Sequence, residues 1–552
     1  MIPENKLTGA ERGVLAAFRA GASAADVART EIRGDFLRGL FLGTYDKEAD
    51  YRGTRIIGAV IPDALDMEFC ETKFPVRFHD CFFAQEIKSQ RLVCPESDFS
   101  NCVLKKGIDA MNAKVAGDVN MTKVHAMDQV WMPSMEVGGR LDCSGGIFQN
   151  NAGVALFAQS IKVVAGVGLC EGFNAMGGVS LSSAVIGGQF DCTGGVFQSK
   201  AGRALNAHSI RVAGSVFLCG EFKGEVNFIG ADIRGQLVCT DGSFQNEEKV
   251  ALIVQCANVD ADVILASHKS NEKDERRRLL ANGLVSFVNA TIGGNLMLNN
   301  CALTRMSLAG ANVLGEFQDD AGIYKNDQGD NIDLDIDGFC YRRLDAAKER
   351  VKDRLAWAGL MSKGDKFRPQ PYEQLMKVYR EMGHMNWARD AGFALEEKRH
   401  GVMNSWMWKG WYRVLRHTIG YGYKPFRALT HWFAPLIVAG IVLFGWSSFF
   451  PDSCRAGNEP FYCMAPSDAG VLLSDDWKIH GKLPKDYPDF SPVYYAVETA
   501  LPVLPLGQTE NWHPKTWWVR RAQAAITIIG ALVLTVLASY GVGVLGPRWK
   551  NE

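Results

Sequence analysis

The chain has 552 residues, a net charge of −1 and 22% charged residues. Because opposite charges balance, a general electrostatic attraction to nucleic acid is not expected, and no nucleic-acid partner is predicted. This length exceeds one ordinary core and predicts several structural units or a repeat array.

Residues 1–48 are predicted to form an N-terminal helical cap. They contain no basic stretch followed by an apolar core, so no signal peptide is expected. Apolar residues around Phe36 to Leu42, in the segment EIRGDFLRGLFLG, have helical spacing. A cap is expected here because the repeat array that follows would otherwise expose unpaired strand edges.

Residues 49–340 are predicted to form a β-solenoid. One phrase recurs: an apolar residue, any residue, usually glycine, any residue, then two apolar residues one position apart. Its starts are separated by 22, 27, 22, 26, 21, 26 and 33 residues, at Val115, Val137, Val164, Ile186, Val212, Ile233, Val259 and Ile292. Short alternating runs broken by glycine indicate strands that turn sharply. The fold class is therefore mainly β, a parallel β-helix of about ten coils.

A longer repeat overlies these coils. LDCSGGIFQNNAGVALFAQSI at Leu141 is echoed by FDCTGGVFQSKAGRALNAHSI at Phe190 and again from Leu237. Two coils therefore make one duplicated unit of 47 to 49 residues.

The cysteines fit the solenoid interior. Twelve of the 14 precede the first long apolar segment, and none forms a C-x-x-C pair. Most occupy alternating apolar positions, as Cys143, Cys192 and Cys239 do, where a reduced thiol acts as a small hydrophobic group. Buried thiols in a reducing cytoplasm are therefore predicted, rather than a metal or redox site.

An acidic segment ends the predicted solenoid. Asp333, Asp335 and Asp337 precede Gly338, as in the first half of a calcium loop. The twelfth position holds Leu344 instead of the bidentate Glu that such a loop requires. We therefore interpret the segment as an exposed acidic strand that leads into a turn.

Helical periodicity follows. Residues 341–402 are predicted to form a helical hairpin linker, broken at Gly383 and His384. Residues 403–430 are predicted to form an amphipathic helix at a bilayer surface. That prediction depends on aromatic residues interleaved with cations: Trp406, Trp408, Lys409, Trp411, Tyr412, Arg413 and Arg416.

Residues 431–552 are predicted to form a transmembrane domain, so the lipid bilayer is an expected partner. Two uncharged segments, about 432–450 and 522–545, are long enough to span. The distribution of Lys and Arg favours the cell inner membrane with both termini in the cytoplasm. Cys454 and Cys463 would then lie on the oxidising side, and they are a candidate disulfide.

The segment between the spans, FSPVYYAVETALPVLPLGQTENW, is too apolar for an ordinary loop. A re-entrant segment is predicted at about 490–508, with a helix that begins at Ser491–Pro492 and ends near Pro502. Span, short helix, irregular turn and span follow each other as in pore-loop channels. The candidate pore residues are Glu498, Thr499, Leu504, Leu506, Gly507 and Gln508.

The sequence is compatible with two functions. In the first, the solenoid binds an unknown protein or small molecule and is coupled to a pore, which requires a homo-oligomer because two helices cannot enclose a channel. In the second, the segment packs two anchor helices, and the solenoid is a tethered scaffold. Glu498→Gln is expected to change the conductance of a pore and to leave a scaffold nearly unaffected.

The phrases PYEQLMKVYREMGH, GYGYKPFRAL and LPLGQ, with coils of the IGGQFDCTGG type, resemble a bacterial family of solenoid proteins labelled membrane-associated oxidoreductases. The membrane end more loosely resembles two-helix potassium-type pore domains, although it has no T-x-G-Y-G filter. A redox enzyme is the third alternative. The residues do not support it, because the G-x-G-x-x-G match at Gly541 to Gly546 follows a membrane segment instead of a strand. No cofactor or catalytic residue is predicted.

Overall fold

The structure is a computed structural model, and the chain divides into two compact units, Met1–Gln374 and Leu375–Glu552. Each unit is described by itself. The residues that the structure describes are 2–27, 29–45, 53–267, 279–324, 331–345, 351–360, 367–402, 405–424, 427–446, 461–463, 489–514 and 517–541.

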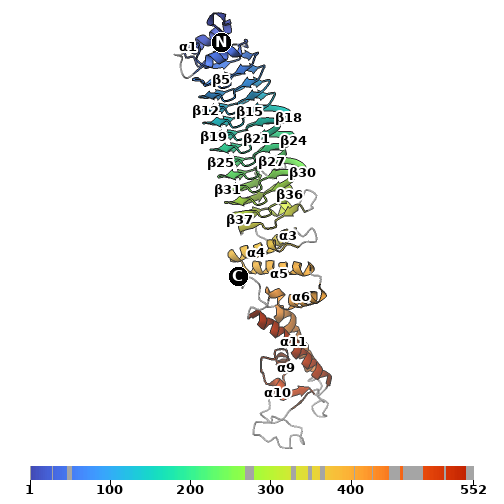
Figure 1. Ribbon diagram of the computed structural model, residues 1–552. Coiled ribbons are helices and arrows are strands. Elements are labelled where there is room, and N and C mark those ends of the chain that lie inside the picture. The colour runs from blue at the N-terminus through green and yellow to red at the C-terminus, as the bar shows by residue number, and fades with distance from the viewer. Residues whose placement is uncertain are drawn as a thin grey trace, which may run out of the picture. The chain divides into compact units, whose positions relative to one another are not determined.

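The first unit is a parallel β-solenoid of about 12 turns, and the predicted fold class is confirmed (Figure 1). Early coils contain four two-residue strands each, as in β8 (Val93–Cys94), β9 (Ser97–Asp98), β10 (Val103–Leu104) and β11 (Ile108–Asp109). Equivalent strands of successive coils pair in parallel. There are more turns than the ten predicted because the coils before Val115 lack the glycine phrase.

Inward-facing residues form continuous rows along the solenoid. One row is built from five phenylalanine rings whose neighbouring centroids lie 4.8 to 5.4 Å apart: Phe148, Phe173, Phe197, Phe222 and Phe244. All five are fully buried. Each contributes roughly 2 to 3 kcal/mol relative to an exposed ring, so the row is a main source of stability.

One predicted repeat position was wrong by a single residue. Val164, expected to face inward, is 68% exposed, and Val163 pairs with Val137 and Ile186 in its place. The prediction followed the glycine of the phrase. Val163 and Val167 are four residues apart, as Ile186 and Phe190 are in the next coil, and this spacing determines which side chains enter the core.

The coil corners use polar residues in a regular way. An Asp at the end of a strand accepts a hydrogen bond from the backbone N–H two residues later, as Asp142 does from Ser144 (3.0 Å) and Asp191 from Thr193 (2.8 Å). The residue directly after this N–H donor often has a positive φ, for example Asn101 at 59°, three residues after Asp98. Asn and Asp adopt this conformation more readily than most residues, but the corners also place Arg91, Lys123 and Ser134 there, so glycine is not required.

Long and short strands alternate from coil to coil. The strands β18 (Ile147–Phe157), β24 (Val196–Asn206) and β30 (Ser243–Ile253) have 11 residues, whereas β21 (Asn174–Ser180) and β27 (Glu221–Asn227) have seven. Each long strand bulges outward, with a register shift against its neighbours. The duplicated sequence unit therefore corresponds to one bulged coil and one flat coil.

A glycine in each flat coil accommodates the preceding bulge. At Gly177, with φ 144°, a Cβ atom would lie 2.6 Å from the carbonyl oxygen of Asn150. At Gly224, with φ 130°, it would lie 2.9 Å from that of Gly202. Any side chain at these positions would therefore collide with backbone and strain φ.

The prediction of buried thiols is confirmed for most of the solenoid cysteines, although Cys256 and Cys340 are exposed. Burial raises the pKa of Cys94 and of Cys301 to about 12. Such thiols stay protonated near neutral pH, so they act as apolar core groups instead of nucleophiles.

The N-terminal cap consists of α1 (Gly9–Arg19), β1 (Ala24–Asp26) and α2 (Gly34–Phe41), which confirms the helix predicted near Phe36. Glu11 is fully buried and forms a capping box with Thr8. Its carboxylate also accepts two hydrogen bonds from the Arg33 guanidinium, at 2.8 and 2.5 Å. This bidentate pair links α1 to the residue that precedes α2.

Burial would raise the pKa of Glu11, but hydrogen bonds from Arg33 and Thr8 hold it below its usual value of 4.5. The carboxylate therefore stabilises the cap above pH 4.5, and this stabilisation is lost as pH falls through the lowered pKa. We expect Glu11→Gln to weaken the protection of α1 amides from hydrogen exchange at pH 7 by about 2 kcal/mol. The difference from wild type should shrink below about pH 4. Glu4→Gln, which breaks an exposed pair with Arg19, is the matched control and should cost less than about 0.5 kcal/mol.

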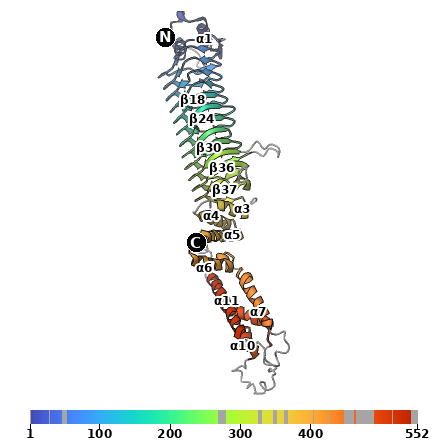
Figure 2. The same ribbon diagram turned by 90° about the vertical axis from the view of Figure 1, so that its right-hand side faces the viewer.

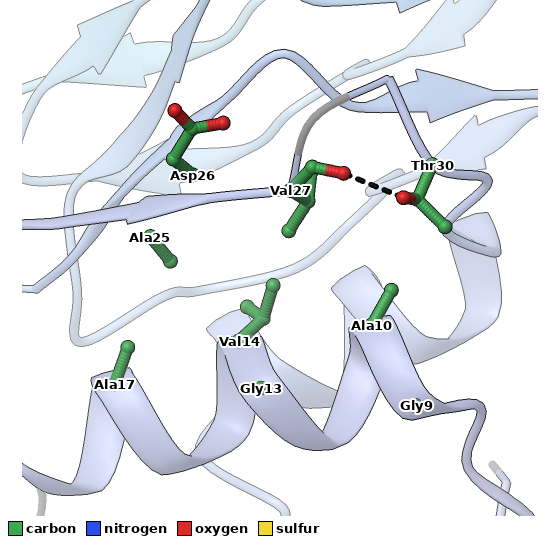
Figure 3. A pocket seen from close by; sticks show the side chains of 9 residues that line it. All are labelled: Gly9, Ala10, Gly13, Val14, Ala17, Ala25, Asp26, Val27 and Thr30. Carbon is green, nitrogen blue, oxygen red and sulfur yellow. Dashed lines mark hydrogen bonds between the residues drawn. The ribbon is translucent and has the colours of Figure 1, made fainter.

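A shallow groove of about 530 Å³ lies between α1 and β1 (Figure 3). Small side chains line it, and a Cβ atom added at Gly9 or Gly13 would meet no atom within 4 Å. Its polar groups are Asp26 and Thr30, and the Thr30 hydroxyl donates to the carbonyl of Val27 at 2.6 Å. The groove therefore offers few directed contacts to a ligand.

The acidic segment at the other end of the solenoid is a strand, as predicted. β38 (Asp333–Asp335) pairs in parallel with β36 (Cys301–Ser307), with Leu334 buried between two exposed carboxylates. A turn at Asp337 and Gly338 follows.

A buried ion pair joins α3 (Val351–Gly359) to the last coils, formed by β37 (Asn312–Asp319) and β39 (Cys340–Leu344). Arg354 donates two hydrogen bonds to Asp319, at 2.9 and 2.6 Å, and the two side chains are 11% and 3% exposed. The Tyr324 hydroxyl also donates to Asp319. The carboxylate is thus fully partnered, as a buried charge must be.

The second unit is helical. The boundary between the units falls within α4 (Gln370–Glu381), and α4 is separated from α5 (Met385–Val402) by the predicted break, where Gly383 has φ 82°. The remaining elements are α6 (Trp406–Thr418), η4 (Gly420–Gly422), η5 (Leu429–Phe433), α7 (Ala434–Trp446), β40 (Phe461–Cys463), α9 (Pro492–Ala500), α10 (Gln508–Asn511), β41 (Trp512–Pro514) and α11 (Trp517–Gly541). Figure 2 shows α7 and α11 side by side.

Candidate membrane-facing site

Two helical stretches of the second unit, Leu429–Trp446 and Trp517–Ser539, are long and apolar enough to cross a membrane. Only 17% and 11% of their residues are buried. A core helix of a soluble protein would be mostly buried, whereas these helices direct large apolar side chains outward. The spans predicted at 432–450 and 522–545 match them in part, and residues 447–450 and 542–545 lie outside the described residues.

Aromatic side chains mark the ends of these helices. Trp446, Trp517 and Trp518 are exposed where α7 ends and α11 begins. At the other end of α11, Val536 and Leu537 pack against the cluster that contains Leu415 of α6, the helix that carries Trp406, Trp408 and Trp411. Tryptophan is enriched at both membrane–water interfaces. With 25 residues, α11 is about 37 Å long, which exceeds a hydrocarbon core of about 30 Å.

The short helix α9 packs between the two long helices. A Cβ atom at Gly440 of α7 would lie 2.8 Å from that of Ala496, and one at Gly530 of α11 would lie 2.1 Å from the carbonyl oxygen of Ala500. Small residues allow such close helix contacts in membranes. The helix begins with Ser491 as its N-cap and Pro492 in its first turn, as predicted.

Glu498 is 6% exposed, and its carboxylate accepts hydrogen bonds from groups of its own chain. One oxygen accepts hydrogen bonds from the backbone N–H groups of Gln508 (2.7 Å) and Thr509 (3.0 Å). The other accepts from the Thr509 hydroxyl (2.9 Å). The carboxylate thereby caps the start of α10, where Gly507 turns the chain with φ 75°. Sequence reasoning missed Thr509.

The other polar candidates also face inward. The Gln508 side chain accepts from the Ser491 N–H at 3.0 Å and donates to the Asp489 carbonyl at 3.2 Å. Thr499 is buried, and its hydroxyl has no hydrogen-bond partner among the described residues. In contrast, Leu504 and Leu506 are exposed on the turn. The structure thus brings Glu498, Gly507 and Gln508 together and leaves the two leucines at the surface.

The candidate disulfide lies partly outside the described residues. Cys463 ends β40, opposite Trp512 of β41, whereas Cys454 is not described. Within the segments that the structure describes, no group of three or more His, Cys, Asp or Glu side chains could hold a metal ion.

Comparison of the chain with models of protein families, with curated proteins and with solved structures found no match in any of the three. The similarity to oxidoreductase-labelled solenoid proteins therefore stays a resemblance.

Proposed function

We propose that this protein is a membrane-anchored scaffold, in which two spanning helices hold a solenoid that presents an extended binding surface. The observation that carries the proposal is the outward apolar surface of α7 and α11, which water does not favour and a bilayer does. The partner on the solenoid is an unknown protein or small molecule, since solenoids commonly bind along their stacked faces.

The solenoid surface offers a short row of alternating charges to such a partner. Glu136 lies between Lys114 (3.1 Å) and Lys162 (3.2 Å) of the adjacent coils. Hydrogen bonds from both lysines hold the pKa of Glu136 below its usual value. The strand register continues this row through Val93 on one side and Val185 on the other, so the three charges form one local cluster on this face.

A non-conducting membrane unit is supported by the inward direction of its polar groups. A selectivity filter directs carbonyl or charged groups toward a water-filled axis. Here Glu498 and Gln508 are used to hold the α9–α10 turn, and the exposed side chains of that turn, Val503, Leu504 and Leu506, are apolar.

A pore is the second candidate, favoured by the position of α9 between two long helices. In a homo-oligomer, the exposed Leu504 and Leu506 would form a hydrophobic constriction of the kind that gates by dewetting. The redox activity implied by the resemblance is not proposed, because the glycine motif begins at Gly541, the last residue of α11. The proposed location is the inner membrane with both termini in the cytoplasm.

Ion flux through liposomes that contain the full chain distinguishes the two. A scaffold should give no flux above protein-free liposomes, both in wild type and in Leu504→Ser/Leu506→Ser. A hydrophobic constriction should conduct more when its leucines are replaced by serine. Glu498→Gln is expected to loosen the α9–α10 turn without producing flux. Flux that rises in the serine variant and vanishes in a chain ending before Phe426 would contradict the scaffold proposal and establish a pore.

A further inference from the structure

One face of α6 is apolar and exposed. Trp406 is 82% exposed, and Met407, Trp411 and Val414 are exposed with it. At 100° per residue these four side chains lie within a sector of about 140° of the helix, and the buried Leu415 lies beside Trp411 at the edge of this sector. An aromatic face of this size on a water-exposed helix indicates a partner.

Cations flank this face, and α6 itself contains no acidic residue. Lys409 and Arg413 are one helical turn apart, on the side of Trp406. Neighbouring cations are already paired: Arg416 with Glu397 (2.5 Å), Lys424 with Asp390 (2.6 Å) and Arg399 with Glu396 (2.6 Å). Within the described part of the chain, Lys409 and Arg413 have no acidic partner, so their charges are available to an external anion.

The C-terminal turn of α6 packs at the end of the candidate spans. Leu415, Ile419 and Tyr421 form a cluster against which Val536 and Leu537 of α11 pack. The indole N–H of Trp432, in η5, donates to the carbonyl of His417 at 3.2 Å. The exposed face therefore continues from the surface that the bilayer is proposed to cover.

We infer that α6 lies on the membrane and binds anionic phospholipids, with Trp406, Met407 and Trp411 at the level of the acyl chains and Lys409 and Arg413 on the headgroup phosphates. The occupant is a lipid because the aromatic face adjoins the spans and the unpaired charges are positive. This inference rests on the proposed membrane anchoring and adds selectivity for lipid charge to it.

Hydrogen exchange of the full chain in nanodiscs tests the inference. The discs contain phosphatidylcholine alone or with one third phosphatidylglycerol, and exchange is followed in α6, α7 and α11. We expect α6 amides to exchange about 30-fold more slowly in the anionic discs, as two cations near an anionic surface would give. In Lys409→Gln/Arg413→Gln the difference should fall below about 3-fold. Both residues are at the helix surface, so the variant should fold.

Lys105→Gln/Lys106→Gln, on exposed solenoid positions, removes the same charge and should keep the full difference. Equal exchange of α6 in both discs, with α7 and α11 protected, would overturn the lipid inference alone. The lipid inference would also be overturned if an added acidic protein slowed the exchange of α6 and phosphatidylglycerol did not. Rapid exchange of α7 and α11 in both discs would instead overturn the proposed anchoring.

Discussion

Lysine in place of Val438 and Ile528 is expected to move the protein out of the membrane fraction. Each residue lies near the middle of one candidate span and is exposed. In water, lysine at an exposed helical position is nearly neutral, whereas at the centre of a spanning helix it costs about 2.5 to 3.5 kcal/mol. The double substitution therefore opposes insertion by about 5 to 7 kcal/mol.

Alkaline extraction of membranes from expressing cells measures this effect. Wild type should stay in the pellet, and Val438→Lys/Ile528→Lys should appear in the supernatant or be degraded. Val164→Lys, at an exposed apolar position of the solenoid, is the matched control and should stay in the pellet. A double variant that partitions like wild type would show that the two helices do not cross the bilayer.

Arg354→Met is expected to destabilise the C-terminal coils of the solenoid by about 3 to 5 kcal/mol. The substitution leaves the buried carboxylate of Asp319 with Tyr324 as its remaining described hydrogen-bond donor. The cost is large because a buried charge without its counter-ion is poorly solvated. Urea-dependent hydrogen exchange in β37 and β39 would measure it.

Two variants check the cause. Arg203→Met breaks an exposed pair with Glu225 and should cost less than about 1 kcal/mol. Adding Asp319→Leu to Arg354→Met removes both charges and should recover more than half of the loss. If the double variant were as unstable as the single one, lost packing of Arg354 over Phe317 and Trp357 would be the cause, since the guanidinium lies 5.6 and 5.2 Å from those rings.

The repetitive part of the fold was predictable because the same sequence pattern recurs in successive coils. Period-two alternation and recurrent glycine indicated the solenoid, and the duplicated phrase indicated coil pairs. The error at Val164 arose where glycine and apolar spacing disagreed by one residue. The coils before Val115 were harder to count because Asp98 and similar residues form their corners without glycine.

The site was predictable only in outline. The two long apolar helices and the short helix follow from local composition, so their existence could be read from the sequence. The partners of Glu498 could not, because ten residues and an irregular turn separate it from Gln508. A lone charge in an apolar segment indicates a partner or a cavity, and the conformation of Leu501 to Gly507 decides which. The ion pair between Arg354 and Asp319 could not be predicted either, because the two residues are 35 positions apart in the sequence.

The alternation of bulged and flat coils limits how this protein can change length. Removing one coil would place two bulges next to each other without Gly177 or Gly224 between them, and a bulge would then meet the side chains of another bulged strand. Removing or adding a pair of coils in this part of the solenoid keeps each bulge against a flat coil. The bulged part therefore has a unit of growth of 47 to 49 residues, and related chains should differ in the length of this part by whole units of that size.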